Sequence, residues 1–233
     1  MAGAGVVMSK SAAARRDPDP QFSLECVRCP RLAAHLAGVR KSNPDYHARP
    51  VAPFGDTSPG LLIVGLAPGM HGANRSGRPF TGDHAGILLY ATLHRYGFAS
   101  QPVAVARDDG LVLTDCRITN AVKCLPPANK PLPAEIRECN VYLRNELAAL
   151  AKGTAVLALG TVAHQAVLRA LDQRSAGFPF AHGASHALPR DITLFDSYHC
   201  SRYNTQTRRL TPEMFHAVFA RIRHYLDRHH TAG

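Results

Sequence analysis

Short apolar runs alternate along this chain with stretches whose apolar residues recur every three or four positions. The apolar runs predict strands, and the unbroken ones are typical of strands covered on both faces. They lie at residues 61–64, 117–122, 155–160 and 191–200. The stretches with helical spacing predict amphipathic helices. These lie at residues 28–41, 84–97, 133–151 and 161–173, and a last helix opens at residues 211–213.

Strands that alternate with helices predict an α/β fold, with a mostly parallel sheet and helices on both of its faces. In such sheets ligands bind outside the carboxyl ends of the strands. The most polar and Gly-rich loops all follow predicted strands, so we expect them to converge at one edge of the sheet. They cover residues 65–83, 119–127 and 198–207. We expect residues 1–20 to be a disordered leader and residues 21–233 to be a single domain.

The charge balance favours a polyanionic partner. Lys and Arg number 27 against 17 Asp and Glu, which gives a formal net charge of +10. Neutralised phosphates release counterions, and this release drives association with nucleic acid. No apolar run is long enough to span a bilayer and no secretory signal opens the chain, so we expect no membrane partner. The expected location is the cytoplasm, with nucleoid association in a prokaryote.

Four of the six cysteines are spaced like the ligands of one metal centre. Cys26 and Cys29 form a C-x-x-C near the start of the chain, and Cys124 and Cys139 bracket a Pro-rich segment. Thiolates in this pattern suit zinc or an iron–sulfur cluster, and a reducing compartment favours metal binding over disulfides. The alternative is that they are ordinary small buried side chains, since free Cys is among the most buried residue types.

Three ordered motifs carry a resemblance to a known family. GLAPGMHGANRSGRPFTGDHAG, TNAVKCLPPANKPLPAEIREC and YHCSRYNTQTRRLT closely resemble the B-type uracil-DNA glycosylases, family 5 of that superfamily. The resemblance implies a three-layer α/β/α sandwich that excises uracil and some other deaminated bases such as hypoxanthine. It also implies a structural 4Fe–4S cluster at the four cysteines named above. Cys116 and Cys200 are left over and are expected to be structural.

Excision of a base requires that it leave the duplex for a closed pocket. There a carboxylate can attract the cationic sugar and orient a water, a His can donate to the departing base, and a side-chain amide can bind its polar edge. The resemblance assigns these catalytic roles to Asp83, His199 and Asn120, and Asn120 would also bind the base. Structural alternatives remain, because Asp83 suits a helix N-cap and Asn120 suits a turn.

The remaining substrate-binding residues come from the first motif. Phe80 matches the aromatic residue that stacks on the base, although a core Phe is the ordinary alternative. Gly65, Ala67 and His71 are the other expected members of the pocket. Related branches place an Asp, Glu or Asn at the position of Ala67, so water activation here is expected to fall to Asp83.

Five polar or aromatic residues are candidates for DNA contact: Arg75, Arg78, Arg202, Tyr203 and Asn204. The arginines are expected to meet phosphates, and Tyr203 is a candidate wedge for the vacated base stack. A solvated surface position is the alternative for each of them.

We therefore expect a monofunctional glycosylase that acts as a monomer on uracil in double-stranded DNA and leaves an abasic site. Strand cleavage is not expected, because the only lysines in the pocket loops, Lys123 and Lys130, fall in the cysteine segment. Two rival hypotheses remain. One is a damaged-DNA-binding protein without turnover, and the other is a zinc-stapled α/β hydrolase that acts on free nucleotides.

Overall fold

A six-stranded sheet forms the centre of the computed structural model, which describes residues 21–230. The strand order is β1-β3-β2-β4-β6-β5, and the four central strands are parallel. The two edge strands, β1 and β5, run antiparallel to their neighbours. The strands are β1 (Phe54–Gly55), β2 (Leu61–Gly65), β3 (Cys116–Asn120), β4 (Ala155–Leu159), β5 (Ser185–Leu188) and β6 (Ile192–Ser197).

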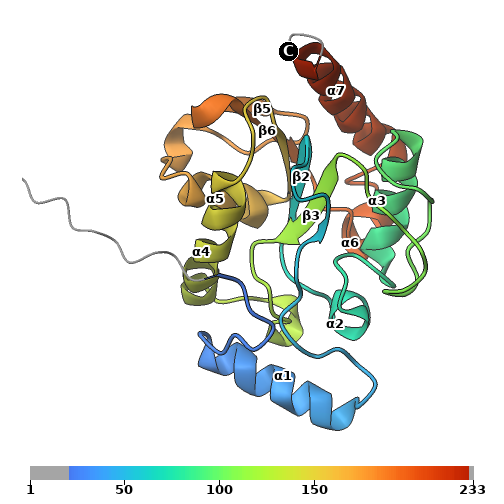
Figure 1. Cartoon of the computed structure of the whole chain (residues 1–233), viewed down its shortest axis with the longest axis vertical. Coiled ribbons are helices and arrows are strands. Elements are labelled where there is room, and N and C mark those ends of the chain that lie inside the picture. Colours follow the sequence, from blue (N-terminus) through green and yellow to red (C-terminus); the bar gives the residue numbers. More distant parts are fainter. Residues whose placement is uncertain (1–20, 231–233) are drawn as a thin grey trace, which may run out of the picture.

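Helices cover both faces of the sheet and complete three layers (Figure 1). On one face, α3 (His84–Arg95) and α7 (Pro212–His230) pack over Ile63 and Leu157. On the other face, α4 (Pro133–Ala148) and α5 (Thr161–Ala170) pack over Val64 and Val156. Residues that alternate along β2 and β4 therefore enter opposite cores, which explains why these strands are unbroken apolar runs.

A third apolar cluster joins the N-terminal part of the described chain to its middle. The helix α1 (Pro30–Ser42) buries Leu32 and Leu36 against Val122 and Leu125, which follow β3. In Figure 1 this helix lies apart from the helices that cover the two faces of the sheet, beneath the end of α4. The remaining elements are short: α2 (Ala73–Ser76), α6 (Arg202–Gln206), and the 3₁₀ turns η1 (Pro127–Asn129), η2 (Ser175–Gly177) and η3 (Pro189–Asp191).

The last helix runs to the edge of the sheet at which the parallel strands begin. A Cβ atom placed on Gly153, two residues before β4, would lie 3.4 Å from the Cβ of His229. The end of α7 therefore lies beside the amino ends of the strands. The long polar loops lie at the other edge.

The predicted α/β sandwich with a mostly parallel sheet is confirmed, and each strand and helix expected from the sequence is present. The sequence did not reveal the two antiparallel edge strands or the short helices α2 and α6. The expected leader at residues 1–20 lies outside the described residues, and the single-domain assignment stays a prediction. Within residues 21–230, no helix is both long enough and apolar enough to cross a membrane.

Candidate active site

A cavity of about 440 Å³ opens at the carboxyl ends of the four parallel strands. Five of the residues singled out in the sequence line it: Ala67, Phe80, Asp83, Asn120 and His199. They come from the end of β3 and from the loops that follow β2 and β6, so the predicted convergence at this edge of the sheet is present. Parallel strands all end at the same edge of the sheet. Ala67 and His199, which are 132 positions apart in the sequence, therefore line one cavity.

Phe80 forms part of the cavity wall in a strained backbone conformation, with φ at 55°. A non-glycine residue in this left-handed region costs about 1–3 kcal/mol. Its ring stacks on the imidazole of His199, with 5.9 Å between ring centroids and 28° between planes. Gly65 leaves the room for this arrangement: a Cβ there would lie 2.7 Å from Phe80 Cζ and would overlap the Asn120 amide oxygen. Gly65 thus shapes the wall although it does not line the cavity.

Asp83 combines two roles that the sequence left as alternatives. It is the N-cap of α3, where Oδ1 accepts the backbone N–H of Gly86 at 2.9 Å, and the same side chain lines the cavity. Burial raises the pKa of Asp83, against the opposing effect of backbone hydrogen bonds. Two glycines leave space for it. A Cβ on Gly72 would overlap the carboxylate, whereas a Cβ on Gly69 would lie 3.5 Å from Oδ2.

Asn120 offers an unused hydrogen-bond acceptor. It ends β3, its side chain is 3% exposed, and its Oδ1 has no hydrogen-bond partner within residues 21–230. A buried acceptor left unpaired costs about 1–3 kcal/mol, so this oxygen is suited to an N–H group of a ligand.

His199 faces the same cavity as a neutral imidazole. Burial lowers the pKa of His199 to about 4, so its ring is uncharged at neutral pH. A neutral imidazole carries one N–H that can donate to an oxygen on which negative charge develops. The cavity therefore combines an aromatic ring, a carboxylate, an amide and a neutral imidazole.

The junction between β4 and α5 is part of the site, and the sequence reasoning missed it. Gly160, Thr161 and Val162 line the cavity, and Gly160 adopts a left-handed conformation at φ 94°. A Gly that follows a buried strand and opens a helix was the available signal. The other residues that line the cavity are Leu66, Gly69, Ala73, Ala85, Asn129, Leu159 and Ser201.

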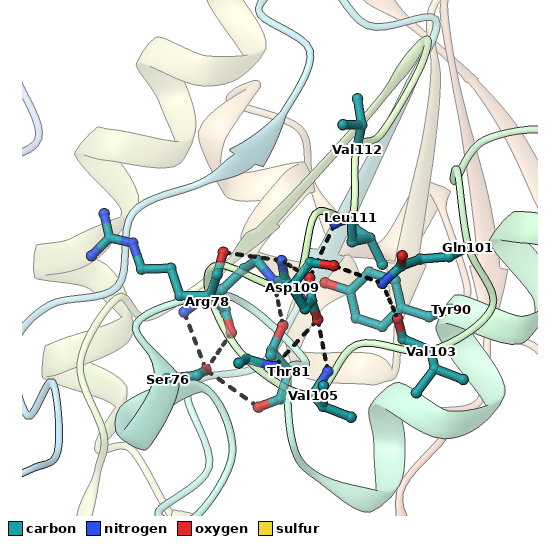
Figure 2. A network of polar contacts seen from close by, with 12 residues as sticks. Ser76, Arg78, Thr81, Tyr90, Gln101, Val103, Val105, Asp109, Leu111 and Val112 are labelled. Atoms are coloured by element: carbon teal, nitrogen blue, oxygen red, sulfur yellow. Dashed lines mark hydrogen bonds and ion pairs between the residues drawn. The ribbon is translucent and has the colours of Figure 1, made fainter.

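His71 and Arg78 do not lie where the sequence placed them. His71 is exposed, does not line the cavity, and its Nδ1 lies 2.8 Å from the Tyr46 hydroxyl. Arg78 is only 3% exposed and forms a bidentate ion pair with Asp109 at 2.8 and 2.7 Å (Figure 2). Its Nε donates to Thr81 Oγ1 at 2.7 Å. Arg78 has no exposed guanidinium for a DNA phosphate, and the DNA-contact assignment is corrected on this ground.

The other candidates for DNA contact lie near the surface. Arg75 and Arg202 are exposed, and Tyr203 is 69% exposed on α6. Asn204 is half-buried, and its side-chain amide donates to the His199 carbonyl at 2.8 Å. Asn204 therefore supports the backbone of His199, while the other three side chains are free to reach a ligand outside the cavity.

The four predicted metal ligands lie together beside α1. All are free thiols and line one small cavity: Cys26, Cys29, Cys124 and Cys139. Burial raises the pKa of Cys29 to about 11. Two hydrogen bonds reach the sulfurs, from the Tyr142 hydroxyl to Cys26 at 3.1 Å and from the Lys123 N–H to Cys139 at 3.3 Å.

The donor set of this cavity fits a metal centre held by thiolates, either one zinc ion or an iron–sulfur cluster. A separate group of close ligand atoms lies elsewhere, where His164, His186 and Asp196 place their atoms within 4.8 Å of one another.

Comparison with known proteins covers both the fold and the site. The sequence model of the Uracil DNA glycosylase superfamily matches residues 52–223. The type-5 uracil-DNA glycosylase of Thermus thermophilus is 46% identical over 205 residues, which cover 86% of this chain and 93% of that protein. The type-5 enzyme of Pyrobaculum aerophilum is 40% identical over 85% of this chain and 88% of its own length. The type-4 uracil-DNA glycosylase of Pyrobaculum aerophilum is 35% identical over only 56% of this chain and 59% of that protein.

Proposed function

This chain belongs to the uracil DNA glycosylase superfamily, and from that premise we propose how its cavity excises the base. It is a uracil-DNA glycosylase of DNA repair, a hydrolase of N-glycosyl bonds. The observation that carries the proposed mechanism is the buried Asn120 oxygen, which has no partner among the described residues and lies in a cavity that also holds Phe80, Asp83 and His199.

The flipped base stacks on Phe80 and pairs with Asn120. Uracil presents an N–H between two carbonyl oxygens, and the Asn120 Oδ1 accepts from that N–H. Deamination of adenine also replaces an acceptor ring nitrogen with N–H, in hypoxanthine. The same acceptor therefore favours deaminated bases as a class, and we extend the proposed substrate range to hypoxanthine on this ground.

Asp83 and His199 share the charge that develops when the bond breaks. Water attacks the sugar C1′ while the bonding electron pair leaves with the base nitrogen. The Asp83 carboxylate attracts the cationic sugar and orients the water, because Ala67 supplies no polar group. The neutral His199 donates its N–H to the base carbonyl that gains negative charge. The proton of the attacking water finally offsets the charge of the released base.

We further propose that the reaction stops at the abasic site and that the enzyme acts as a monomer on double-stranded DNA in the cytoplasm or nucleoid. Strand cleavage usually needs an amine nucleophile, and no lysine lines the cavity among residues 21–230. Lys123 is buried and paired with Glu146 instead.

The four cysteines would hold a 4Fe–4S cluster with a structural role. When bound, the cluster supplies cross-links between the segment before α1, the loop after β3 and α4. Hydrolysis of the N-glycosidic bond involves no net redox change, so the cavity residues need no electron from it.

The test is cleavage of a duplex with a single uracil under single-turnover conditions, followed by alkali. Wild type should yield abasic product, Asp83→Asn should lose most of it, and Asp172→Asn, an exposed carboxylate away from the cavity, should keep it. Tight binding of the uracil duplex without product would favour the damage-binding alternative. Release of uracil from free deoxyuridine but not from DNA would favour the nucleotide hydrolase.

A further inference from the structure

We infer that Arg78 and Asp109 are positioning residues that hold Phe80 and Asp83 in the geometry needed for excision. This inference rests on the proposed function of the cavity. It assigns a role to a buried ion pair that touches neither the cavity nor the expected path of DNA.

The polar atoms of Arg78 and Asp109 bond to each other and to nearby backbone groups. Arg78 donates through both terminal nitrogens to the two Asp109 oxygens, and its Nη1 also lies 3.3 Å from the Arg107 carbonyl. Asp109 in turn accepts three backbone N–H groups of its own loop, those of Val105, Ala106 and Leu111, at 2.9–3.2 Å. The guanidinium beside it holds the pKa of Asp109 well below its usual range. The carboxylate thus organises the loop of residues 101–111 around one buried point (Figure 2).

This loop is fastened to the segment that carries the site. The Gly82 N–H donates to the Ala104 carbonyl at 3.0 Å, and Arg78 Nε donates to Thr81 Oγ1 at 2.7 Å. These two bonds hold the residues on the C-terminal side of Phe80, whose left-handed backbone requires support from its neighbours. Gly82, the last of them, directly precedes Asp83. Residues 78–83 form no helix or strand, so contacts with neighbouring segments hold their path.

Other contacts fix the same segment from two more sides. The Tyr90 hydroxyl of α3 donates to the Pro79 carbonyl at 2.7 Å, and the Ser76 hydroxyl lies 3.3 Å from the Thr81 carbonyl. Contacts from α2, α3 and the loop of residues 101–111 therefore meet at residues 78–82, and the Arg78–Asp109 pair is the only charged one among these. An ion pair has narrower angular tolerance than apolar packing, so its geometry specifies the backbone path more closely.

The experiment compares single-turnover excision and duplex affinity in Arg78→Lys and Asp109→Asn. Asp109→Asn is isosteric and replaces one acceptor oxygen with a donor, whereas Arg78→Lys keeps the positive charge but is shorter and removes the planar fork. We expect the excision rate to fall by about 100-fold, the order expected for a small misplacement of catalytic groups, with little change in Kd for the uracil duplex. The matched control is Ile222→Val in the core of α7, assayed equally far below its own Tm.

If Arg78→Lys and Asp109→Asn lose stability as Ile222→Val does yet excise uracil at the wild-type rate, the pair is only structural and the inference is overturned. If neither variant folds, Thr81→Val serves in their place, because it removes one bond of the network and keeps the ion pair. A wild-type rate in that variant would likewise overturn the inference. Failure of the proposed function looks different: wild type would then be as inactive as Asp83→Asn.

Discussion

At the residue scale, the site depends on small residues as much as on reactive ones. Asp83 caps a helix and lines the cavity at the same time, so its carboxylate is fixed by the backbone that it stabilises. Gly65 and Gly72 permit this crowding, since a Cβ at either position would overlap Asn120 or Asp83. Such glycines are needed for close approach, and a sequence motif does not show which side chain approaches.

A pair of glycine substitutions tests this crowding. Gly72→Ala should lower the excision rate by about 100-fold, because its Cβ displaces the Asp83 carboxylate. Gly69→Ala lines the same cavity but places its Cβ at ordinary contact distance, 3.5 Å from Asp83 Oδ2, and should stay near the wild-type rate. Single-turnover kinetics of the two variants provide the measurement. Equal rates for both would show that Asp83 is not confined in this way.

The acid dependence of the rate follows from the same burial. Excision needs the ionised Asp83, and burial raises the pKa of Asp83, so the rate should rise with pH through a midpoint above the ordinary Asp value of about 4. His199, with its pKa lowered to about 4, is neutral at neutral pH and should add no loss of rate there. A pH–rate profile checks this expectation. The small residual excision rate of Asp83→Asn should not fall at low pH. If it still falls, a group other than Asp83 causes the loss of rate in acid.

At the element scale, strands and helices with a buried apolar face were predictable because periodicity reports burial directly. The edge strand β5 has mixed polarity and β1 has two residues, so neither carries that signal. The helix α6 is capped by Ser201, whose side chain accepts the Asn204 N–H, but its five residues are polar and give it no apolar face. The site was predictable where motifs marked it. The contribution of Thr161 and Val162 depends on which strands are neighbours, which a single sequence does not state.

A buried histidine ties α5 to β6 behind the cavity. His164 Nδ1 lies 2.7 Å from Asp196 Oδ1 and its Nε2 lies 2.9 Å from the Phe178 carbonyl. Both partners are acceptors, so the protonated ring, with an N–H on each nitrogen, satisfies both of them. Burial opposes this charge, but the Asp196 carboxylate and the Phe178 carbonyl outweigh it and raise the pKa of His164.

Loss of this cation should therefore destabilise the fold in a pH-dependent manner. His164→Gln should lower the free energy of unfolding by about 3–5 kcal/mol, the usual cost of breaking a buried ion pair. Because the folded-state pKa is raised, the difference should be full below about pH 6.5 and should shrink as pH rises through that pKa. Urea unfolding of both proteins over this range measures it. A difference that grows with pH would mean that the folded protein holds a neutral ring.

The cysteine centre gives a second test at this scale. Cys124→Ser should lose bound iron and sulfide and unfold at lower temperature, because the metal cross-link between the segment before α1 and the loop after β3 is then lost. Excision per folded molecule should remain, since the cavity is lined by other residues. Cys116→Ser, a buried thiol in the opposite core, is the control that should keep its iron. Iron analysis, thermal melting and active-site titration provide the three readouts.

At the scale of the whole molecule, the formal net charge of +10 does not say which of the 27 Lys and Arg side chains can reach DNA. Arg78 and Lys123 are buried and paired, whereas Arg75 and Arg202 are exposed near the cavity. Affinity for DNA should therefore depend on a few exposed cations at one edge of the sheet rather than on the total charge.

The salt dependence of binding distinguishes these groups. Arg75→Ala and Arg202→Ala should each weaken duplex binding and reduce the slope of log K against log salt by about 1, because each removes one phosphate contact. Arg190→Ala is the control, since its guanidinium donates to the Leu147 and Ala148 carbonyls away from the cavity. Fluorescence anisotropy at several salt concentrations gives the slopes. An unchanged slope in both cavity-side variants would place the DNA elsewhere on the surface.

The end of α7 beside Gly153 is a suitable attachment point for experiments on single, immobilised enzyme molecules. Coupling through this end, by a dye, a bead or a fused partner, places the attachment at the amino edge of the strands, across the sheet from the cavity. The cavity of a tethered molecule would remain accessible to a stretched DNA duplex. Single enzymes could then be watched while they search for damage, with the handle out of the path of the DNA.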